Sequence, residues 1–221
     1  MTPLRGALAA LALALFLLAQ PSLAQQHDKP GEFDFYVLAL SWTPSYCEAE
    51  GDKRAGDEQC SRARPYAFVV HGFWPQYERG YPRSCVERAP YIPNHTIQSV
   101  MDLMPARGLI IHQWRTHGTC SGLQPQRYFE KLREARERVQ IPARFHRLND
   151  YAMVSPAEVE RAFIDANPQL PAGAVSVTCD NRRLREVRIC MDKDLSFRDC
   201  AENERRACRA SRVVMPPVRG G

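Results

Sequence analysis

Eight cysteines are the feature that most limits how this chain of 221 residues can fold. Their number is even, the first is Cys47, the last is Cys208, and no two are spaced as Cys-x-x-Cys. In an exported chain an even number predicts disulfides, and the missing Cys-x-x-Cys disfavours redox catalysis and a thiolate zinc site. Their order favours local pairs, Cys47 with Cys60 and Cys85 with Cys120, followed by a nested set among the last four. The order alone leaves the connectivity open.

The N-terminal residues have the pattern of a secretion signal. Arg5 is followed by an apolar run at 7–19, which is short for a membrane span, and then by the small-x-small pattern Ser22-Leu23-Ala24. We therefore predict a signal peptide at residues 1–24, a single exported domain at 25–221, and no membrane attachment after cleavage. An uncleaved anchor is the less favoured alternative. The alanine- and leucine-rich leader favours a periplasmic protein, and a eukaryotic secretory route stays open.

The charge balance permits a polyanionic partner without requiring one. The formal net charge is +5 at pH 7, and many of the arginines fall in one predicted helix and in the tail, where a solvated surface is the simpler explanation. We find no internal repeat, no low-complexity tract and no sign of a second domain.

Apolar patterns predict four strands. They are expected at 33–42, at 66–71 with an end at Gly72, at 174–179 and at 184–191. In the last of these, Glu186, Arg188 and Cys190 alternate with apolar residues, which predicts one buried and one more open face.

Helices and loops are predicted between these strands. Helices are expected from an Asn94 cap through Met104, across 109–119, at 126–139, and from a capping box at Ser155 and Glu158 to about Asn167. Loops are expected at 47–64 and 76–91, and a frayed tail at 216–221.

Two short segments combine histidine, tryptophan and glycine. The first is His71-Gly72-Phe73-Trp74-Pro75, and the second is His112-Gln113-Trp114-Arg115-Thr116-His117-Gly118-Thr119-Cys120. Imidazole exchanges a proton near neutral pH, and indole offers a flat surface on which a base can stack. Two proton carriers and a stacking surface are what metal-free cleavage of RNA requires.

These segments resemble the two active-site motifs of the ribonuclease T2 family, His-Gly-Leu-Trp-Pro and His-Glu-Trp-x-Lys-His-Gly-Thr-Cys. Residues 36–47 also resemble the family's first strand and cysteine turn, so the likeness runs in order from about Phe33 to Cys120 and rests afterwards on cysteine spacing. It implies an α+β fold with a central, mostly antiparallel β-sheet packed with helices. It also implies disulfides joining Cys179 with Cys208 and Cys190 with Cys200.

The resemblance implies a role for each histidine. His117 is expected to be the general base and His71 the general acid, while His112 binds the phosphate. The expected reaction is the cleavage of single-stranded RNA by transesterification through a 2′,3′-cyclic phosphate. It implies no cofactor and no metal, and we expect a monomer.

The three tryptophans are predicted to differ in role. The resemblance places Trp74 in a base-binding site, which Gln76 and the nearby tyrosines could complete. For Trp42 and Trp114 we expect core packing, because large aromatic side chains usually serve there.

The second motif departs from the family at two positions that matter chemically. Gln113 stands where the family usually has glutamate, and Thr116 where it usually has lysine. An amide and a hydroxyl can still donate hydrogen bonds to a phosphate, but more weakly than an ammonium group. We expect Gln113 to serve in catalysis and Thr116 to bind the substrate, in an enzyme that is slower than its relatives. The alternative is a catalytically weakened relative that binds RNA or another partner.

A zinc hydrolase fits the sequence poorly. His112 and His117 are five residues apart rather than four, and no His-Glu-x-x-His pattern occurs. A disulfide-stabilised binding scaffold would explain the cysteines but would leave both histidine motifs unexplained.

Overall fold

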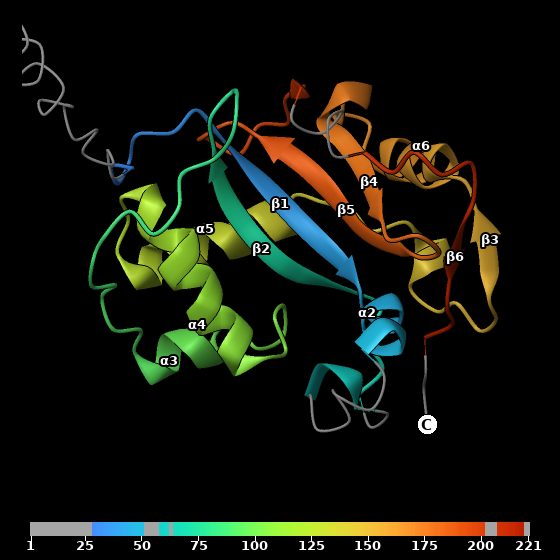
Figure 1. The fold of residues 1–221 in the computed structure, drawn as a ribbon, viewed down its shortest axis with the longest axis horizontal. Helices are drawn as coiled ribbons and strands as arrows, with labels where there is room; N and C mark the ends of the chain where they lie inside the picture. The colour runs from blue at the N-terminus through green and yellow to red at the C-terminus, as the bar shows by residue number, and fades with distance from the viewer. Residues whose placement is uncertain (1–27, 51–57, 62–63, 202–206, 219–221) are drawn as a thin grey trace, which may run out of the picture.

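A four-stranded antiparallel sheet forms the centre of the molecule. The computed structural model describes residues 28–50, 58–61, 64–201 and 207–218, so the predicted signal peptide lies outside the described residues. The strands are β1 (Phe35–Trp42), β2 (Phe68–Gln76), β4 (Val175–Cys179) and β5 (Leu184–Met191), in the order β2-β1-β5-β4 (Figure 1). Every neighbouring pair is antiparallel, which confirms the predicted α+β fold with its antiparallel sheet.

A β-bulge interrupts the pairing of β1 with β2. Leu40 lies opposite Val70 and Ala39 opposite Gly72, so His71 is the extra residue. The bulge resets the alternation of the strand, and both Val70 and Phe73 are fully buried although they are three residues apart. Bulges are frequent beside active sites because they redirect a side chain.

The two faces of the sheet differ in size and in cover. One face carries the main core, and helix α5 (Pro125–Glu137) crosses behind it in Figure 1. The amphipathic pattern of α5 is as predicted, with Phe129, Leu132 and Ala135 buried. The other face has a small cluster of Phe35, Val37 and the Cys190–Cys200 pair, against which Trp74 packs.

The remaining elements surround this sheet. They are the helices α2 (Thr43–Glu50), α3 (Asn94–Gln98), α4 (Arg107–Thr116) and α6 (Pro156–Ala166), the strands β3 (Ala152–Val154) and β6 (Val213–Met215), which pair with each other, and the short 3-10 turns at Glu58–Cys60, Gly118–Ser121, Ala143–Phe145 and Ala172–Ala174. Helix α6 begins at the predicted capping box, in which Ser155 and Glu158 bond each other's backbone N–H groups. Among the described residues, no helix combines the length and apolar character needed to cross a membrane.

Three predicted boundaries were wrong. Part of the loop expected at 47–64 is helix α2, because Pro44 is compatible with the first turn of a helix. Strand β2 continues past Gly72 to Gln76. The helix expected from Asn94 through Met104 ends at Gln98, and turns follow it in which Val100 N–H donates to Ile97 O and Leu103 N–H to Val100 O.

The predicted tail is held for longer than expected. Pro216 O accepts a hydrogen bond from Trp42 Nε1 at 3.0 Å, and the Val218 N–H donates to Leu148 O at 2.8 Å. Only residues 219–221 of the predicted tail lie outside the described residues.

Four disulfides join the described residues. The pairs are Cys47–Cys60, Cys85–Cys120, Cys179–Cys208 and Cys190–Cys200, as predicted from cysteine order and from the family resemblance. The second pair ties the loop after β2 to the end of the second histidine motif.

Candidate active site

Three histidines reach one site from two neighbouring elements. His71 sits on the bulge of β2, and His112 is exposed on α4. Helix α4 ends at Thr116, so His117 follows it with φ −121° and ψ −45° and starts a 3-10 turn. The helix predicted across 109–119 therefore ends before His117, and the regular turn of 100° per residue does not relate His112 to His117.

The indole of Trp74 lies between the two motifs. Its ring centroid is 5.4 Å from that of His71 and 5.5 Å from that of His117. Its Nε1 donates a hydrogen bond to Gln113 Oε1 at 2.6 Å, which joins β2 to α4. Gly72 permits this approach, because a Cβ there would overlap the indole nitrogen and lie 2.6 Å from Gln113 Oε1.

An ionised carboxylate supports His71. Nδ1 of His71 is 2.5 Å from Glu186 Oε1, and Arg188 donates to Glu186 Oε2 from Nε at 2.9 Å and from Nη2 at 2.7 Å. Burial alone would raise the pKa of Glu186, but the hydrogen bond and charge of His71, together with Arg188, lower it to about 2. Glu186 is therefore a carboxylate throughout the working pH range.

His117 has the opposite environment. Burial, and after it the charges of His112, Arg83 and His71, lower its pKa to about 4. Among the described residues its buried Nδ1 has no hydrogen-bond partner. Above about pH 4 this imidazole is neutral and can accept a proton.

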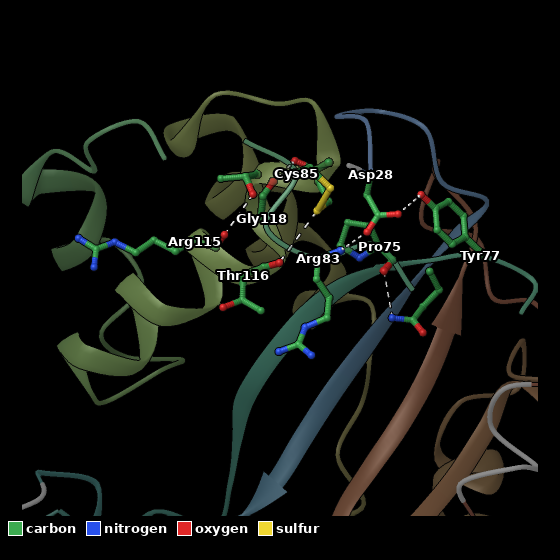
Figure 2. The surroundings of a disulfide bond; sticks show 12 residues. Asp28, Pro75, Tyr77, Arg83, Cys85, Arg115, Thr116 and Gly118 are labelled. Atoms are coloured by element: carbon green, nitrogen blue, oxygen red, sulfur yellow. Dashed lines mark hydrogen bonds between the residues drawn. A yellow bond between two sulfur atoms is a disulfide. The ribbon is translucent and has the colours of Figure 1, made fainter. Parts of the chain in front are cut away.

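The loop after β2 brings a cation to the side of His117. Asp28 accepts hydrogen bonds from the Arg83 backbone N–H and the Tyr77 hydroxyl, and Ser84 N–H donates to Thr116 O at 2.8 Å. Figure 2 shows this tether beside the Cys85 disulfide, with the Arg83 side chain extending along the Thr116 side of α4. The loop thus places a guanidinium near the position where the family usually has lysine.

The two departing residues of the second motif occupy different surroundings. Gln113 is buried and accepts the Trp74 hydrogen bond, a role that a glutamate could also fill. Thr116 is partly exposed at the end of α4. Arg115, the nearest cation in sequence, points away from Thr116 in Figure 2, as the helical geometry predicts.

The other predicted residues separate into core and site. Trp42 and Trp114 are 0% and 1% exposed, which confirms core packing. Gln76 is also buried, and its amide donates to Pro75 O at 3.0 Å, so the structure does not bring it into the group of histidines. Its part in base binding stays a prediction.

A pocket of about 680 Å³ adjoins the histidines. His71, His112 and Glu186 border it, together with residues such as Tyr46, Leu109 and Arg185. Among the described residues, no three His, Cys, Asp or Glu side chains gather in a way that could hold a metal ion. Metal-free chemistry nevertheless stays a prediction.

Three charged residues of the site were missed in the sequence. Glu186 and Arg188 were predicted to share the more open face of their strand, but nothing local indicates that Glu186 meets a residue 115 positions away. Arg83 lies in a loop with no motif of its own, and only its closeness to Cys85 hints that it is drawn to the site.

Comparisons with known proteins agree on one family. Residues 33–200 match the Ribonuclease T2 family. A ribonuclease from Aeromonas hydrophila is 36% identical over 177 residues, which cover 78% of each chain. Ribonuclease I of Escherichia coli (strain K12) is 25% identical over 235 aligned positions, which cover 86% of each chain.

Solved structures share the fold. An RNase-related protein from Calystegia sepium has a TM-score of 0.68 at 21% identity, covering 85% of this chain and 98% of its own. RNase NT, solved in complex with 5′-AMP, has a TM-score of 0.62 at 23% identity, covering 84% of this chain and 99% of its own.

Proposed function

Because the chain belongs to the Ribonuclease T2 family, we propose that it is an endoribonuclease that cleaves single-stranded RNA by metal-free transesterification. RNA supplies its own nucleophile, the 2′-hydroxyl, so the protein needs only to move protons and to stabilise charge on the phosphate. The imidazoles of His71 and His117 on either side of the Trp74 ring, with His112 beside His71 in the pocket, meet this need.

The first step divides the proton transfers between two histidines. His117 takes the proton of the 2′-hydroxyl, the 2′-oxygen bonds to phosphorus, and the bond from phosphorus to the 5′-oxygen breaks. His71 gives its proton to that departing oxygen, and the products are a 2′,3′-cyclic phosphate and a free 5′-hydroxyl. His112, exposed at the mouth of the pocket, binds the phosphate oxygens.

The contrast between the two proton carriers is the observation that carries this assignment. His117 has a pKa of about 4 and is neutral in mild acid, as a base must be. His71 instead places Nδ1 against the carboxylate of Glu186, which leaves Nε2 as the nitrogen that can give a proton to the departing oxygen. Groups whose environments differ in this way are typical of acid and base partners.

We also propose a binding surface for the nucleotide base and a cellular location for the protein. The partly exposed Trp74 and the neighbouring Tyr81, whose ring is 6.2 Å from His117, offer surfaces for a base on one side. The four disulfides support an oxidising location, so residues 1–24 would direct the chain to the periplasm or the exterior.

The test uses the purified, oxidised protein with single-stranded RNA in excess EDTA, together with His71→Ala and His117→Ala. We expect fragments ending in 2′,3′-cyclic phosphate, and a loss of about 10²-fold or more in rate for each variant. His146→Ala is the control, because that imidazole bonds Ile141 O away from the site.

Intact RNA with the wild-type protein would overturn this function. The protein would then be a relative that binds RNA or another partner without cleaving it. Gln113→Glu and Thr116→Lys would be the first substitutions with which to restore cleavage. Activity that needs an added metal would instead overturn the metal-free mechanism.

A further inference from the structure

Glu186 contacts both His71 and Arg188. Its two oxygens are divided: Oε1 faces Nδ1 of His71, and Oε2 accepts both hydrogen bonds of Arg188. The side chain is only 12% exposed. It is held on β5, between β1 and β4, where it lies opposite Ser41 and Thr178.

Arg188 extends this unit toward the second motif. Its guanidinium carbon is 5.2 Å from the Trp74 ring, and Trp74 Nε1 in turn donates to Gln113. The carboxylate that meets His71 is therefore fixed by the backbone of a central strand and by a cation that itself rests on the indole. Side chains held on strands in this way are positioned more tightly than those on loops.

The geometry rules out Glu186 as a proton carrier in its own right. It is ionised at any working pH, since its pKa is about 2, and both its oxygens are occupied. What it can do is accept the Nδ1–H of His71, which leaves Nε2 as the atom that exchanges protons with the substrate.

We propose that Glu186, locked by Arg188, is a positioning residue that holds His71 as the Nδ1–H tautomer and orients its Nε2 toward the leaving oxygen. This rests on the proposed function of His71 as general acid. When the bond from phosphorus to the 5′-oxygen breaks, the Nε2 proton passes to that oxygen, and the imidazole becomes neutral with its Nδ1–H still bonded to Glu186. No proton moves to the carboxylate.

Arg188 makes the Glu186→Gln variant informative. The guanidinium has only donors to offer, so the amide oxygen of the glutamine turns toward Arg188. Its NH₂ group then faces Nδ1 of His71, which must become an acceptor. The form of His71 with a proton on both nitrogens then has no acceptor for its Nδ1–H. The same loss follows when an amide replaces the carboxylate beside a catalytic histidine.

The experiment compares two substrates that differ only in the leaving group. One is a dinucleoside phosphate, whose 5′-oxygen needs a proton, and the other is the 4-nitrophenyl ester of the same nucleoside 3′-phosphate, whose phenolate leaves without one. For Glu186→Gln we expect a fall of about 10²-fold in kcat on the dinucleoside phosphate, with KM little changed and the nitrophenyl ester nearly unaffected. The double variant with His71→Ala should be no slower than His71→Ala alone.

A matched ion pair provides the control. Nε of Arg183 is 2.8 Å from Oε1 of Glu48, and the side chains of Glu48 and Arg183 are 16% and 17% exposed. Neither residue borders the pocket beside His71. Glu48→Gln removes another carboxylate of low exposure that is paired with an arginine, so it reports the general cost of losing such a pair. We expect it to lower thermal stability without any selective loss on the dinucleoside phosphate.

Two further measurements keep the test decisive if Glu186→Gln is unstable. Glu186→Asp keeps the charge opposite Arg188 but shortens the reach to His71, so its loss should have the same selectivity and a smaller size. The ¹⁵N shifts of His71 in the neutral form should show the proton on Nδ1 in the wild type and on Nε2 in Glu186→Gln.

The outcomes separate the two proposals. If the wild type and His71→Ala behave as proposed, but Glu186→Gln slows both substrates equally or neither, only the positioning role is overturned. If the wild type cleaves nothing, or if His71→Ala keeps full activity on the dinucleoside phosphate, the proposed function falls and the role of Glu186 falls with it.

Discussion

The strand side and the helix side of the cleft support their histidines in different ways. On the strand side, His71 contacts an ionised carboxylate that is itself paired with Arg188. On the helix side, His117 is partly buried and its Nδ1 has no hydrogen-bond partner among the described residues. The positions where the family usually has glutamate and lysine hold the neutral Gln113 and Thr116.

This difference separates the acid from the base by environment rather than by residue type. Burial and nearby cations favour a neutral imidazole at His117, whereas the carboxylate of Glu186 accepts the Nδ1–H of His71. Gln113 and Thr116 carry no charge, and burial together with the charges of His112, Arg83 and His71 lowers the pKa of His117 to about 4. The departures from the family motif thus fit a site that keeps its base unprotonated in mild acid.

The strand side meets the helix side where Gly72 lies against Trp74 and Gln113, and activity should be most sensitive to substitution there. In Gly72→Ala the new Cβ would overlap the Trp74 nitrogen and crowd Gln113, so the indole must move away from both motifs. We expect a loss of about 10²-fold or more in kcat/KM and of about 1–3 kcal/mol in the free energy of unfolding. Activity assays and denaturant unfolding measure the two effects.

Gly108→Ala is the control for this prediction, because a Cβ at Gly108 would have no atom within 4 Å outside its chain neighbours and the backbone of its own helix. A helical alanine there should leave the unfolding free energy equal or higher. If Gly72→Ala were as active and stable as the wild type, the strand side and the helix side would not depend on this close approach.

Residues such as Gly72 also show how far the sequence alone could lead. The order of the motifs indicated the family, the family resemblance together with cysteine order indicated the four disulfides, and strand alternation indicated strand β5. The bulge was missed, although the spacing of Val70 and Phe73 indicates a change of alternation. The contact of Glu186 with His71 could not be predicted, because it arises only when two strands, which do not pair directly, enter one sheet on either side of β1.

The pH dependence gives a second way to sharpen the contrast. A general base works only when it is unprotonated, so kcat/KM of the wild type should fall as the pH drops through about 4, the pKa of His117. Gln113→Glu would place a carboxylate on the helix side, which favours the imidazolium and raises that pKa. We expect the acid limb to move up by about one pH unit, with a loss of about fivefold at pH 4 that approaches about tenfold at lower pH, and little change at pH 7.

Gln126→Glu is the matched control, since it adds the same charge on the exposed face of α5. An acid limb that moves equally in both variants would point to a general effect of net charge. A limb that moves in neither would mean that His117 is not the group that must be unprotonated.

The smallest expected effect comes from restoring a cation on the helix side. The charge of Arg83 already acts on His117 and lowers its pKa, so the site is not without a cation although Thr116 is neutral. Thr116→Lys should therefore raise kcat/KM only several-fold at low salt, and the gain should shrink as salt screens the exposed charge. In an Arg83→Ala background the same change should give a larger gain, because the lysine would then supply the missing cation. Equal gains in both backgrounds would show that Arg83 does not serve the phosphate, and that the helix side works with neutral donors alone.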